Sequence, residues 1–353
     1  MRAAVYYGNQ DVRVTSVPEP EDPGPGEVLL RVRRASLCGT DVSEYLHGPL
    51  MIPVHEPDPV TGHQGPTVLG HEFMGEVVAC GPDAGTFRVG QRVACGAGVW
   101  CGLCSWCRLG RTNLCARYYT LGLQTHGGLA EFVRVPARTC REVPPACSDE
   151  AAAIAQPTAV AVHALRRSGW APGMRLVVIG TGGIGSLLIG VARAWGGEGI
   201  VAVDVDSSRL ELAERVGASH RLQIGRDEVR RGVQEVTGGE GADVVVESSG
   251  AEGVLEQAAE LVRRGGTVLQ VGLPHRAPQV PIREMVLREI NLITTVAHVC
   301  DRDLPEALQV LASTDLAARV VDRVIPLGEV VPAGLLALAR REAAGKVLVD
   351  PSG

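Results

Sequence analysis

The sequence has 353 residues, 45% of them hydrophobic and 21% charged, which excludes a largely disordered chain. At roughly 150 residues per domain, this length predicts two domains. The formal net charge is −6 with both signs interspersed, which excludes the basic face that a nucleic-acid-binding protein needs. No run reaches the roughly 18 apolar residues of a membrane span, and residues 1–10 lack the pattern of a signal peptide. We therefore expect a cytoplasmic protein that binds neither nucleic acid nor membrane.

Residues 1–152 are predicted to form a β-rich domain. Short alternating runs, such as residues 3–7 and 28–32, are punctuated by proline and glycine. Residues 47–66 contain five prolines and three histidines. This composition predicts a solvated loop rather than a further metal site.

Ten cysteines are present, and four of them fall within fifteen residues. At this spacing four thiolates can converge on one tetrahedral zinc ion and leave no position for water, as in structural zinc sites. Iron–sulfur clusters use similar spacings, but the surrounding sequence offers no electron-transfer context. We therefore predict a structural zinc bound by Cys101, Cys104, Cys107 and Cys115, and free thiols at Cys80, Cys95, Cys140, Cys147 and Cys300.

From residue 153 the pattern changes. An alanine-rich helical segment is followed by short aliphatic strands that alternate with amphipathic helices, which predicts βαβ units and a parallel sheet. The expected strands lie at 176–180, 200–204, 243–247 and 267–272. The alternation ends near residue 291, so the second domain is predicted at 153–290. Residues 291–353 are predicted to return to the first domain and to end in a strand at 346–350.

A glycine-rich turn between a strand and a helix predicts a dinucleotide site. Residues 177–185 combine a buried strand with the pattern G-x-G-x-x-G, whose glycines let the backbone approach a pyrophosphate at a helix N-terminus. The next strand ends at Asp204, whose carboxylate would bind the ribose hydroxyls of NAD and repel the 2′-phosphate of NADP. Arg209 would flank the adenine, unless it is a solvated residue on a helix face. The predicted cofactor-binding residues of this turn and strand are Gly180, Gly182, Gly183, Ile184, Gly185, Asp204 and Arg209.

Two further motifs, taken with these sites, give the chain a resemblance to a known family. The motifs are C-G-T-D at 38–41 and G-H-E at 70–72. The chain resembles the zinc-dependent medium-chain alcohol dehydrogenases over essentially its whole length. Within that family it is similar to the (R,R)-butanediol dehydrogenase branch, and more distantly to sorbitol dehydrogenase. This similarity is carried by the segments 47–53, 59–63, 69–73, 156–164 and 345–350.

The resemblance implies a fold and a second metal site. The fold is α/β, with a GroES-like β-rich catalytic domain built from both chain ends and a doubly wound Rossmann coenzyme domain between them. A catalytic zinc would be bound by Cys38, His71 and Glu72, with an open position for the substrate. Each chain would then hold two zinc ions, one catalytic and one structural. The family also implies a homodimer or homotetramer.

The resemblance further implies hydride transfer between NAD and a small alcohol or ketone. Zinc lowers the pKa of the substrate hydroxyl, and the alkoxide that forms delivers hydride to the nicotinamide. Thr40 would pass on the hydroxyl proton, unless it is merely a loop hydroxyl. Val271, Gly272 and Leu273 would back the nicotinamide ring. Lys346 would contact the pyrophosphate, unless it is a surface lysine.

Two positions depart from the family pattern. Gln156, which we count among the catalytic residues, stands where relatives have a glutamate near the catalytic zinc. Ser43 stands where they have a histidine that ends a proton relay. A neutral amide near the zinc is expected to lower the pKa of zinc-bound water or alcohol. Because serine cannot act as a base near pH 7, Glu44, His47 or water would have to take the proton.

Three functions follow from these observations. The leading one is an NAD-dependent dehydrogenase of a vicinal diol or acyloin, such as 2,3-butanediol or acetoin. The second is a dehydrogenase of a polyol or sugar-like secondary alcohol in specialised metabolism, because a pocket can change while the zinc motifs stay. The third is a catalytically silent NAD-binding protein, which Gln156 and Ser43 favour and the intact zinc motifs oppose.

Overall fold

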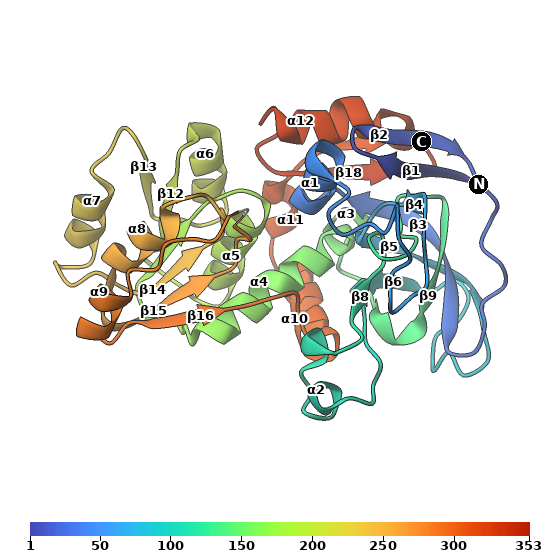
Figure 1. Ribbon diagram of the computed structural model, residues 1–353, viewed down its shortest axis with the longest axis horizontal. Coiled ribbons are helices and arrows are strands. Elements are labelled where there is room, and N and C mark those ends of the chain that lie inside the picture. Colours follow the sequence, from blue (N-terminus) through green and yellow to red (C-terminus); the bar gives the residue numbers. More distant parts are fainter. Residues whose placement is uncertain (275) are drawn as a thin grey trace. The chain divides into compact units, whose positions relative to one another are not determined.

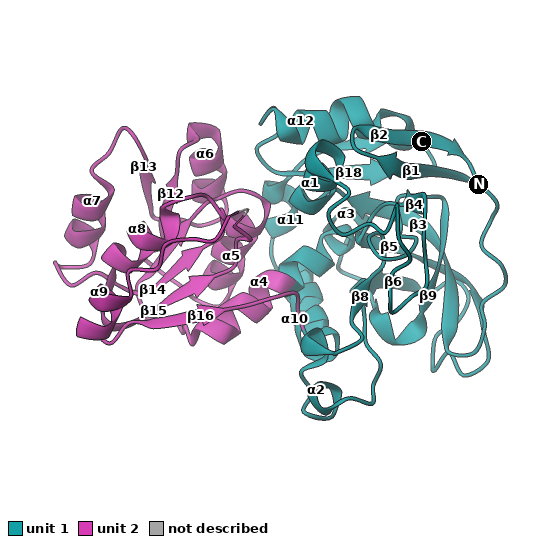
Figure 2. Ribbon diagram, viewed as in Figure 1, with its two compact units in different colours: residues 1–159, 299–353 teal, residues 160–298 magenta. Residues whose placement is uncertain are grey.

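The computed structural model describes residues 1–274 and 276–353, which form two compact units (Figure 2). Unit 1 comprises Met1–Ala159 and Val299–Gly353, and unit 2 comprises Val160–His298. Unit 1 is therefore built from both ends of the chain. Its strand-rich architecture and the parallel sheet of unit 2, labelled in Figure 1, confirm the predicted α/β fold class. None of the described helices combines the length and the apolar character needed to cross a membrane.

The main sheet of unit 1 contains seven described strands, in the order β10-β6-β5-β3-β18-β17, with β9 also paired to β3. These strands are β3 (Glu27–Ser36), β5 (Glu72–Cys80), β6 (Arg92–Cys95), β9 (Phe132–Pro136), β10 (Cys140–Glu142), β17 (Val321–Pro326) and β18 (Lys346–Asp350). A second sheet of unit 1 consists of β1 (Arg2–Gly8), β2 (Asp11–Ser16) and β4 (Thr67–Val68). A two-stranded ribbon consists of β7 (Gly98–Val99) and β8 (Tyr119–Thr120).

Strand β3 shows why the main sheet forms. Val28, Leu30 and Val32 are buried, whereas Arg31 and Arg33, which flank Val32, are exposed. This alternation is that of a strand with one face on the core and one face in solvent. The buried side chains pack with residues of β5 and β18 in the core of unit 1.

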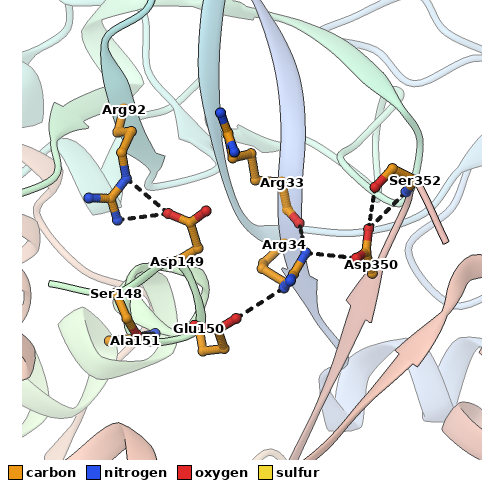
Figure 3. A network of polar contacts seen from close by, with 9 residues as sticks. All are labelled: Arg33, Arg34, Arg92, Ser148, Asp149, Glu150, Ala151, Asp350 and Ser352. Carbon is orange, nitrogen blue, oxygen red and sulfur yellow. Dashed lines mark hydrogen bonds and ion pairs between the residues drawn. The ribbon is translucent and has the colours of Figure 1, made fainter.

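The last strand links the two chain ends of unit 1. β18 pairs antiparallel with β3 and parallel with β17. Figure 3 shows Arg34 of β3 between two carboxylates, with its Nη1 2.9 Å from Asp350 Oδ2 and its Nε 3.3 Å from Glu150 Oε1. Partly exposed ion pairs of this kind contribute about 1 kcal/mol or less each. Strand pairing and burial therefore do more than these ion pairs to hold the C-terminal segment.

Most helices of unit 1 are short. Residues 48–66 contain neither helix nor strand, so the loop predicted at 47–66 is confirmed except at His47, which is the last residue of a helix. The α-helices that begin in unit 1 are α1 (Gly39–His47), α2 (Ser105–Arg108), α3 (Asp149–Ala153), α4 (Ala155–Ser168), α10 (Cys300–Ser313), α11 (Leu316–Val320) and α12 (Leu336–Ala339). Three 3₁₀ turns and one π-helical turn lie at Thr112–Leu114, Ala137–Thr139, Leu327–Glu329 and Val330–Leu335.

Unit 2 contains a sheet of six described strands, all parallel, in the order β13-β12-β11-β14-β15-β16. The strands are β11 (Leu176–Ile179), β12 (Val201–Asp204), β13 (His220–Gln223), β14 (Ala242–Glu247), β15 (Val262–Gln270) and β16 (Asn291–Thr294). The helices that begin within it are α5 (Gly183–Ala194), α6 (Ser207–Arg215), α7 (Val229–Val236), α8 (Val254–Leu261) and α9 (Ile282–Leu287). The strand order reverses between β11 and β14, where doubly wound folds bind their ligands.

The four predicted strands of unit 2 correspond to β11, β12, β14 and β15. β11 is buried throughout, as expected for a central parallel strand. The sequence interpretation missed β13 and β16. Both lie at the edges of the sheet, and their largely exposed residues lack the aliphatic run by which the central strands were recognised.

Candidate metal centres and dinucleotide site

The predicted catalytic ligands come together in unit 1. One ligand atom each of Cys38, His71 and Glu72 lies within 4.8 Å of the other two. Cys38 follows β3 and caps α1, whereas Glu72 begins β5, and the pairing of these strands sets Ser36 opposite Glu72. The sheet register therefore brings together residues that are more than thirty positions apart in the sequence.

The imidazole of His71 is buried and lies against a carboxylate. Its Nδ1 is 3.5 Å from Asp41 Oδ1, while Asp41 Oδ2 accepts a hydrogen bond from the backbone N–H of Cys38 at 2.8 Å. Burial lowers the pKa of His71, but Asp41 and Cys38 more than compensate and raise it well above its usual range. Acidic groups thus surround the imidazole, and a cation bound there would balance their charge. A carboxylate behind a metal-binding imidazole is also the usual way of fixing its orientation.

Glu72 makes a buried ion pair with Lys346. The Nζ of Lys346 is 2.5 Å from Glu72 Oε2 and donates a hydrogen bond to Leu37 O at 2.8 Å. Lys346 is only 4% exposed, so the alternative of a surface lysine was wrong. Its predicted contact with a pyrophosphate stays a prediction, because the partners seen are all in unit 1. Glu72 Oε1 is buried and accepts no hydrogen bond from the described residues, which fits a metal ligand.

Thr40, which is predicted to pass on the substrate proton, lies in α1, and Gln156, which is predicted to lie near the zinc, lies in α4. Thr40 Oγ1 lies 3.8 Å from Cys38 Sγ, and Gln156 lies partly exposed in the first turn of α4. Glu44 is fully buried, and its carboxylate accepts hydrogen bonds from the backbone N–H groups of Leu50 (2.9 Å) and Met51 (2.5 Å). The carboxylate of Glu44 is therefore already engaged in hydrogen bonds, whereas His47 is exposed. The choice of proton acceptor among Glu44, His47 and water stays a prediction.

The four clustered cysteines also converge. One Sγ each of Cys101, Cys104, Cys107 and Cys115 lies within 4.8 Å of the others. Backbone N–H groups point at the sulfur atoms, as in the 3.4 Å bond from Cys104 N to Cys101 Sγ. Such donors stabilise thiolates, and hydrogen bonds from the backbone N–H groups of Ala116 and Cys107 lower the pKa of Cys104 to about 6. Four thiolates form a closed tetrahedral set, which fits a structural zinc.

The glycine motif connects β11 to α5 in unit 2. Gly180 has φ +84°, and a Cβ on it would lie 2.8 Å from the backbone N of Ser249. Gly182 caps α5, which continues through Gly183 and Ile184, and a Cβ on Gly185 would lie 1.9 Å from Gly180 O. Gly180 is thus required by its left-handed conformation and Gly185 by its close approach to Gly180 O. The backbone N–H groups at the N-terminus of α5 could bind an anion.

Asp204 ends β12 beside this turn. Its Oδ2 accepts hydrogen bonds from Thr181 N at 2.7 Å and from the Thr181 hydroxyl at 3.2 Å, and its Oδ1 accepts one from Asp206 N at 3.0 Å. The guanidinium of Arg209 lies next to Gly182, because a Cβ on that glycine would be 3.8 Å from Arg209 Cζ. The sequence interpretation missed Thr181 and Asp206, which are turn residues with no motif of their own.

The segment predicted to back the nicotinamide follows β15. Val271 and Gly272 donate their backbone N–H groups to Glu247 O, at 2.8 and 3.0 Å, and the side chain of Leu273 is exposed. The segment therefore lies at the same carboxyl edge of the parallel sheet as the glycine turn. Sequence reasoning found the segment but not Glu247, which belongs to no motif.

Comparison with known proteins places the chain in a family. Residues 24–145 match the model of the alcohol dehydrogenase GroES-like domain, and residues 183–313 match that of zinc-binding dehydrogenase. The chain is 32% identical to (R,R)-butanediol dehydrogenase of Bacillus subtilis (strain 168) over 355 residues, which covers 100% of both proteins. The chain belongs to the zinc-dependent medium-chain alcohol dehydrogenases. Like its family, it is an NAD(P)-dependent oxidoreductase of alcohols.

Other members of the family differ in the substrates that their names give. Sorbitol dehydrogenase of Bacillus subtilis (strain 168) is 31% identical over 89% of this chain and 86% of its own length. The crystal structure of 2R,3R-butanediol dehydrogenase from Bacillus subtilis has a TM-score of 0.91 at 31% identity and covers 99% of both chains. This medium-chain dehydrogenase is thus similar to both the butanediol and the sorbitol enzymes.

Proposed function

We propose that this medium-chain dehydrogenase uses NAD to interconvert a vicinal diol and its acyloin, such as 2,3-butanediol and acetoin. The observation that carries the proposal is the convergence of Cys38, His71 and Glu72 within 4.8 Å. A thiolate, an imidazole and a carboxylate form a set that suits zinc and leaves one tetrahedral position open. The similarity to butanediol dehydrogenase over the full length supports the diol.

The residues around this set have separable tasks. Zinc bound there would act as a Lewis acid on the substrate oxygen, while NAD would accept the hydride. Asp41 Oδ1, 3.5 Å from His71 Nδ1, would orient the imidazole ring when a metal is bound, so that the ligand geometry is fixed before the substrate arrives. The Thr40 hydroxyl receives the substrate proton. Because the Glu44 carboxylate is occupied by Leu50 and Met51, the proton then leaves through His47 or water.

NAD rather than NADP is the proposed dinucleotide, and Asp204 is the reason. Its carboxylate is 4% exposed and hydrogen-bonded to Thr181 in the glycine turn, so it is fixed beside the dinucleotide site. A buried anion at this place binds ribose hydroxyls and repels a 2′-phosphate. Arg209 would lie along the adenosine half.

Two zinc ions per chain are proposed, one at each group of ligands. The four-cysteine group has no open position, so its zinc would stabilise the lobe at residues 101–115 without touching the substrate. The group at Cys38 would carry the chemistry.

A polyol or sugar-like secondary alcohol is the second candidate substrate. The observation that favours it is the similarity to sorbitol dehydrogenase, which covers 89% of this chain. A diol and a polyol both present a secondary alcohol next to another hydroxyl group. The same ligand set at Cys38 therefore serves either substrate.

Self-association through unit 2 is also proposed. β16 is the last strand in its sheet, and the neighbouring helix α9 exposes Ile282 (64%), Val286 (68%) and Leu287 (58%). An open strand edge beside an apolar surface suits pairing with a second copy of the same edge. A homodimer or homotetramer in the cytoplasm is the expected form, and the mass of the native particle in light scattering tests it.

The decisive experiment measures metal and turnover together. Purified protein should contain about two zinc ions per chain and produce NADH when NAD and 2,3-butanediol are added. Sorbitol in place of the butanediol separates the two candidate substrates. The Cys38→Ser variant is the matched control, because it should lose turnover and one zinc while retaining the other. Turnover of neither alcohol, with both zinc ions present, would overturn the proposed substrates.

A further inference from the structure

A buried carboxylate lies at the end of β14, outside the predicted site. Glu247 is 1% exposed. Its oxygens accept hydrogen bonds from the backbone N–H groups of Ser249 (2.7 Å) and Gly250 (3.0 Å), from the Ser249 hydroxyl and from Gln270 Nε2. Among the residues that the structure describes, no arginine or lysine pairs with it. A buried carboxyl group whose two oxygens are both occupied by turn and side-chain donors fixes the positions of those donors relative to one another.

Glu247 is connected to the segment at residues 271–273 in two ways. Its backbone carbonyl accepts the N–H groups of Val271 and Gly272, and its carboxylate accepts Gln270 Nε2, which also donates to Gly272 O at 2.7 Å. The packing here is close, because a Cβ on Gly272 would lie 2.2 Å from Gly250 N and 2.8 Å from Glu247 Oε2. The carboxylate thus holds the turn after β14 against the segment after β15.

The same turn also packs against the glycine motif. Ser248 donates its backbone N–H to Ile179 O at 2.9 Å, and its hydroxyl donates to Gly180 O. On this side a Cβ on Gly180 would lie 2.8 Å from the backbone N of Ser249. Residues 248–250 therefore form a spacer between the two segments that the proposed function assigns to the dinucleotide.

We propose that Glu247 is a positioning residue for the nicotinamide half of the coenzyme. By binding the N–H groups of residues 249 and 250 and the amide of Gln270 at once, it fixes the distance from the glycine turn to residues 271–273. The adenosine half depends instead on Asp204 and Arg209, which Glu247 does not contact. This inference rests on the proposed dinucleotide site.

The Glu247→Gln variant tests the inference with little change in side-chain size. One acceptor oxygen becomes an NH₂ group, so either Gln270 Nε2 faces another donor or the Gln270 amide turns and loses its bond to Gly272 O. We expect NADH to bind about tenfold more weakly in a fluorescence titration. ADP-ribose, which lacks the nicotinamide, should bind as in the wild type. In turnover, KM for NAD should rise more than kcat falls.

Asp243→Asn is the matched control, because Asp243 lies at the other end of the same strand. Its carboxylate accepts a hydrogen bond from Arg175 N at 2.7 Å and pairs with Arg263 Nε at 2.6 Å. We expect this variant to lower the melting temperature and to leave both affinities unchanged. Asp243→Asn thus shows how the loss of a structural interaction on β14 affects stability and ligand binding.

The outcomes separate the possibilities. Weakened NADH binding with unchanged ADP-ribose binding supports the positioning role of Glu247. Equal weakening of both ligands, or of neither, overturns it. If Glu247→Gln does not fold, Gln270→Met carries the same test, because it removes the contact from the other side. A wild-type protein that binds neither NADH nor ADP-ribose would instead overturn the proposed dinucleotide function.

Discussion

Replacing Lys346 by methionine tests how charge is balanced at the proposed catalytic metal site. Methionine has a similar length but no charge, so the substitution removes the ion pair with Glu72 Oε2 (2.5 Å) and the hydrogen bond to Leu37 O (2.8 Å). The Lys346 and Glu72 side chains are 5% and 1% exposed, so water cannot replace the lost partner. In metal-free protein the Glu72 carboxylate is then left buried without the ammonium group that pairs with it.

The size of the destabilisation caused by Lys346→Met depends on whether zinc is bound. Breaking a buried ion pair by removing one partner costs about 3–5 kcal/mol, and we expect a loss in this range in the free energy of unfolding of metal-free protein. A zinc ion at Glu72 supplies positive charge in place of the ammonium group. We therefore expect the loss of unfolding free energy to be smaller by about 2 kcal/mol when zinc is present. This difference means that Lys346→Met binds zinc roughly thirtyfold more tightly than the wild type does.

Denaturant unfolding of wild type and Lys346→Met, with chelator and with added zinc, measures this difference. Both proteins lose the zinc of the four-cysteine group in chelator, so that contribution cancels in the comparison. Lys346→Arg keeps the positive charge and serves as the control. Its loss of unfolding free energy should differ less between chelator and added zinc than that of Lys346→Met. An equal loss with and without zinc would refute the reasoning. Weaker NADH binding with unchanged stability would point instead to the predicted pyrophosphate contact.

Three further predictions test the remaining site residues. Cys104→Ser should release the lobe zinc and lower the free energy of unfolding by more than roughly 3 kcal/mol, with catalysis retained in the folded fraction; full zinc content and wild-type stability would contradict the structural site. Asp204→Gly should raise KM for NAD about tenfold while improving the relative use of NADP, and a wild-type preference for NADP would contradict this. Gln156→Glu should move the oxidation limb of the pH–kcat/KM profile to higher pH, because an added negative charge disfavours the alkoxide; an unchanged limb at equal zinc content would show that residue 156 does not sense the metal.

The sequence predicted those parts of the fold that depend on local pattern. The aliphatic strands of unit 2 and the glycine turn follow from runs of buried residues and from backbone conformations that only glycine adopts readily. The edge strands β13 and β16 could not be found in this way, because their residues are polar or exposed and pairing with a neighbour defines them. Similarly, the loop at residues 48–66 was predictable from its prolines.

The candidate site was predictable only where a motif or a resemblance marked it. Four cysteines at short spacing identify their own cluster, whereas Cys38 and Glu72 are brought together by the pairing of β3 with β5. Lys346 reaches the same place through the C-terminal strand, and no local pattern relates residues 72 and 346. Glu247 belongs to no motif at all, because its partners are backbone N–H groups of a turn.

The charges around Cys38 favour the hypothesis that a zinc centre with Gln156 beside it would be active. A thiolate and a carboxylate as ligands would balance a zinc ion by themselves. The structure adds one anion, Asp41 behind His71, and one cation, Lys346 beside Glu72, and these two cancel. With zinc bound, the proposed centre would therefore be neutral, and a glutamate close to it at position 156 would make it negative. A neutral centre is the stronger Lewis acid and stabilises the alkoxide at lower pH. The neutral amide of Gln156 would thus leave the net charge of the proposed centre at zero.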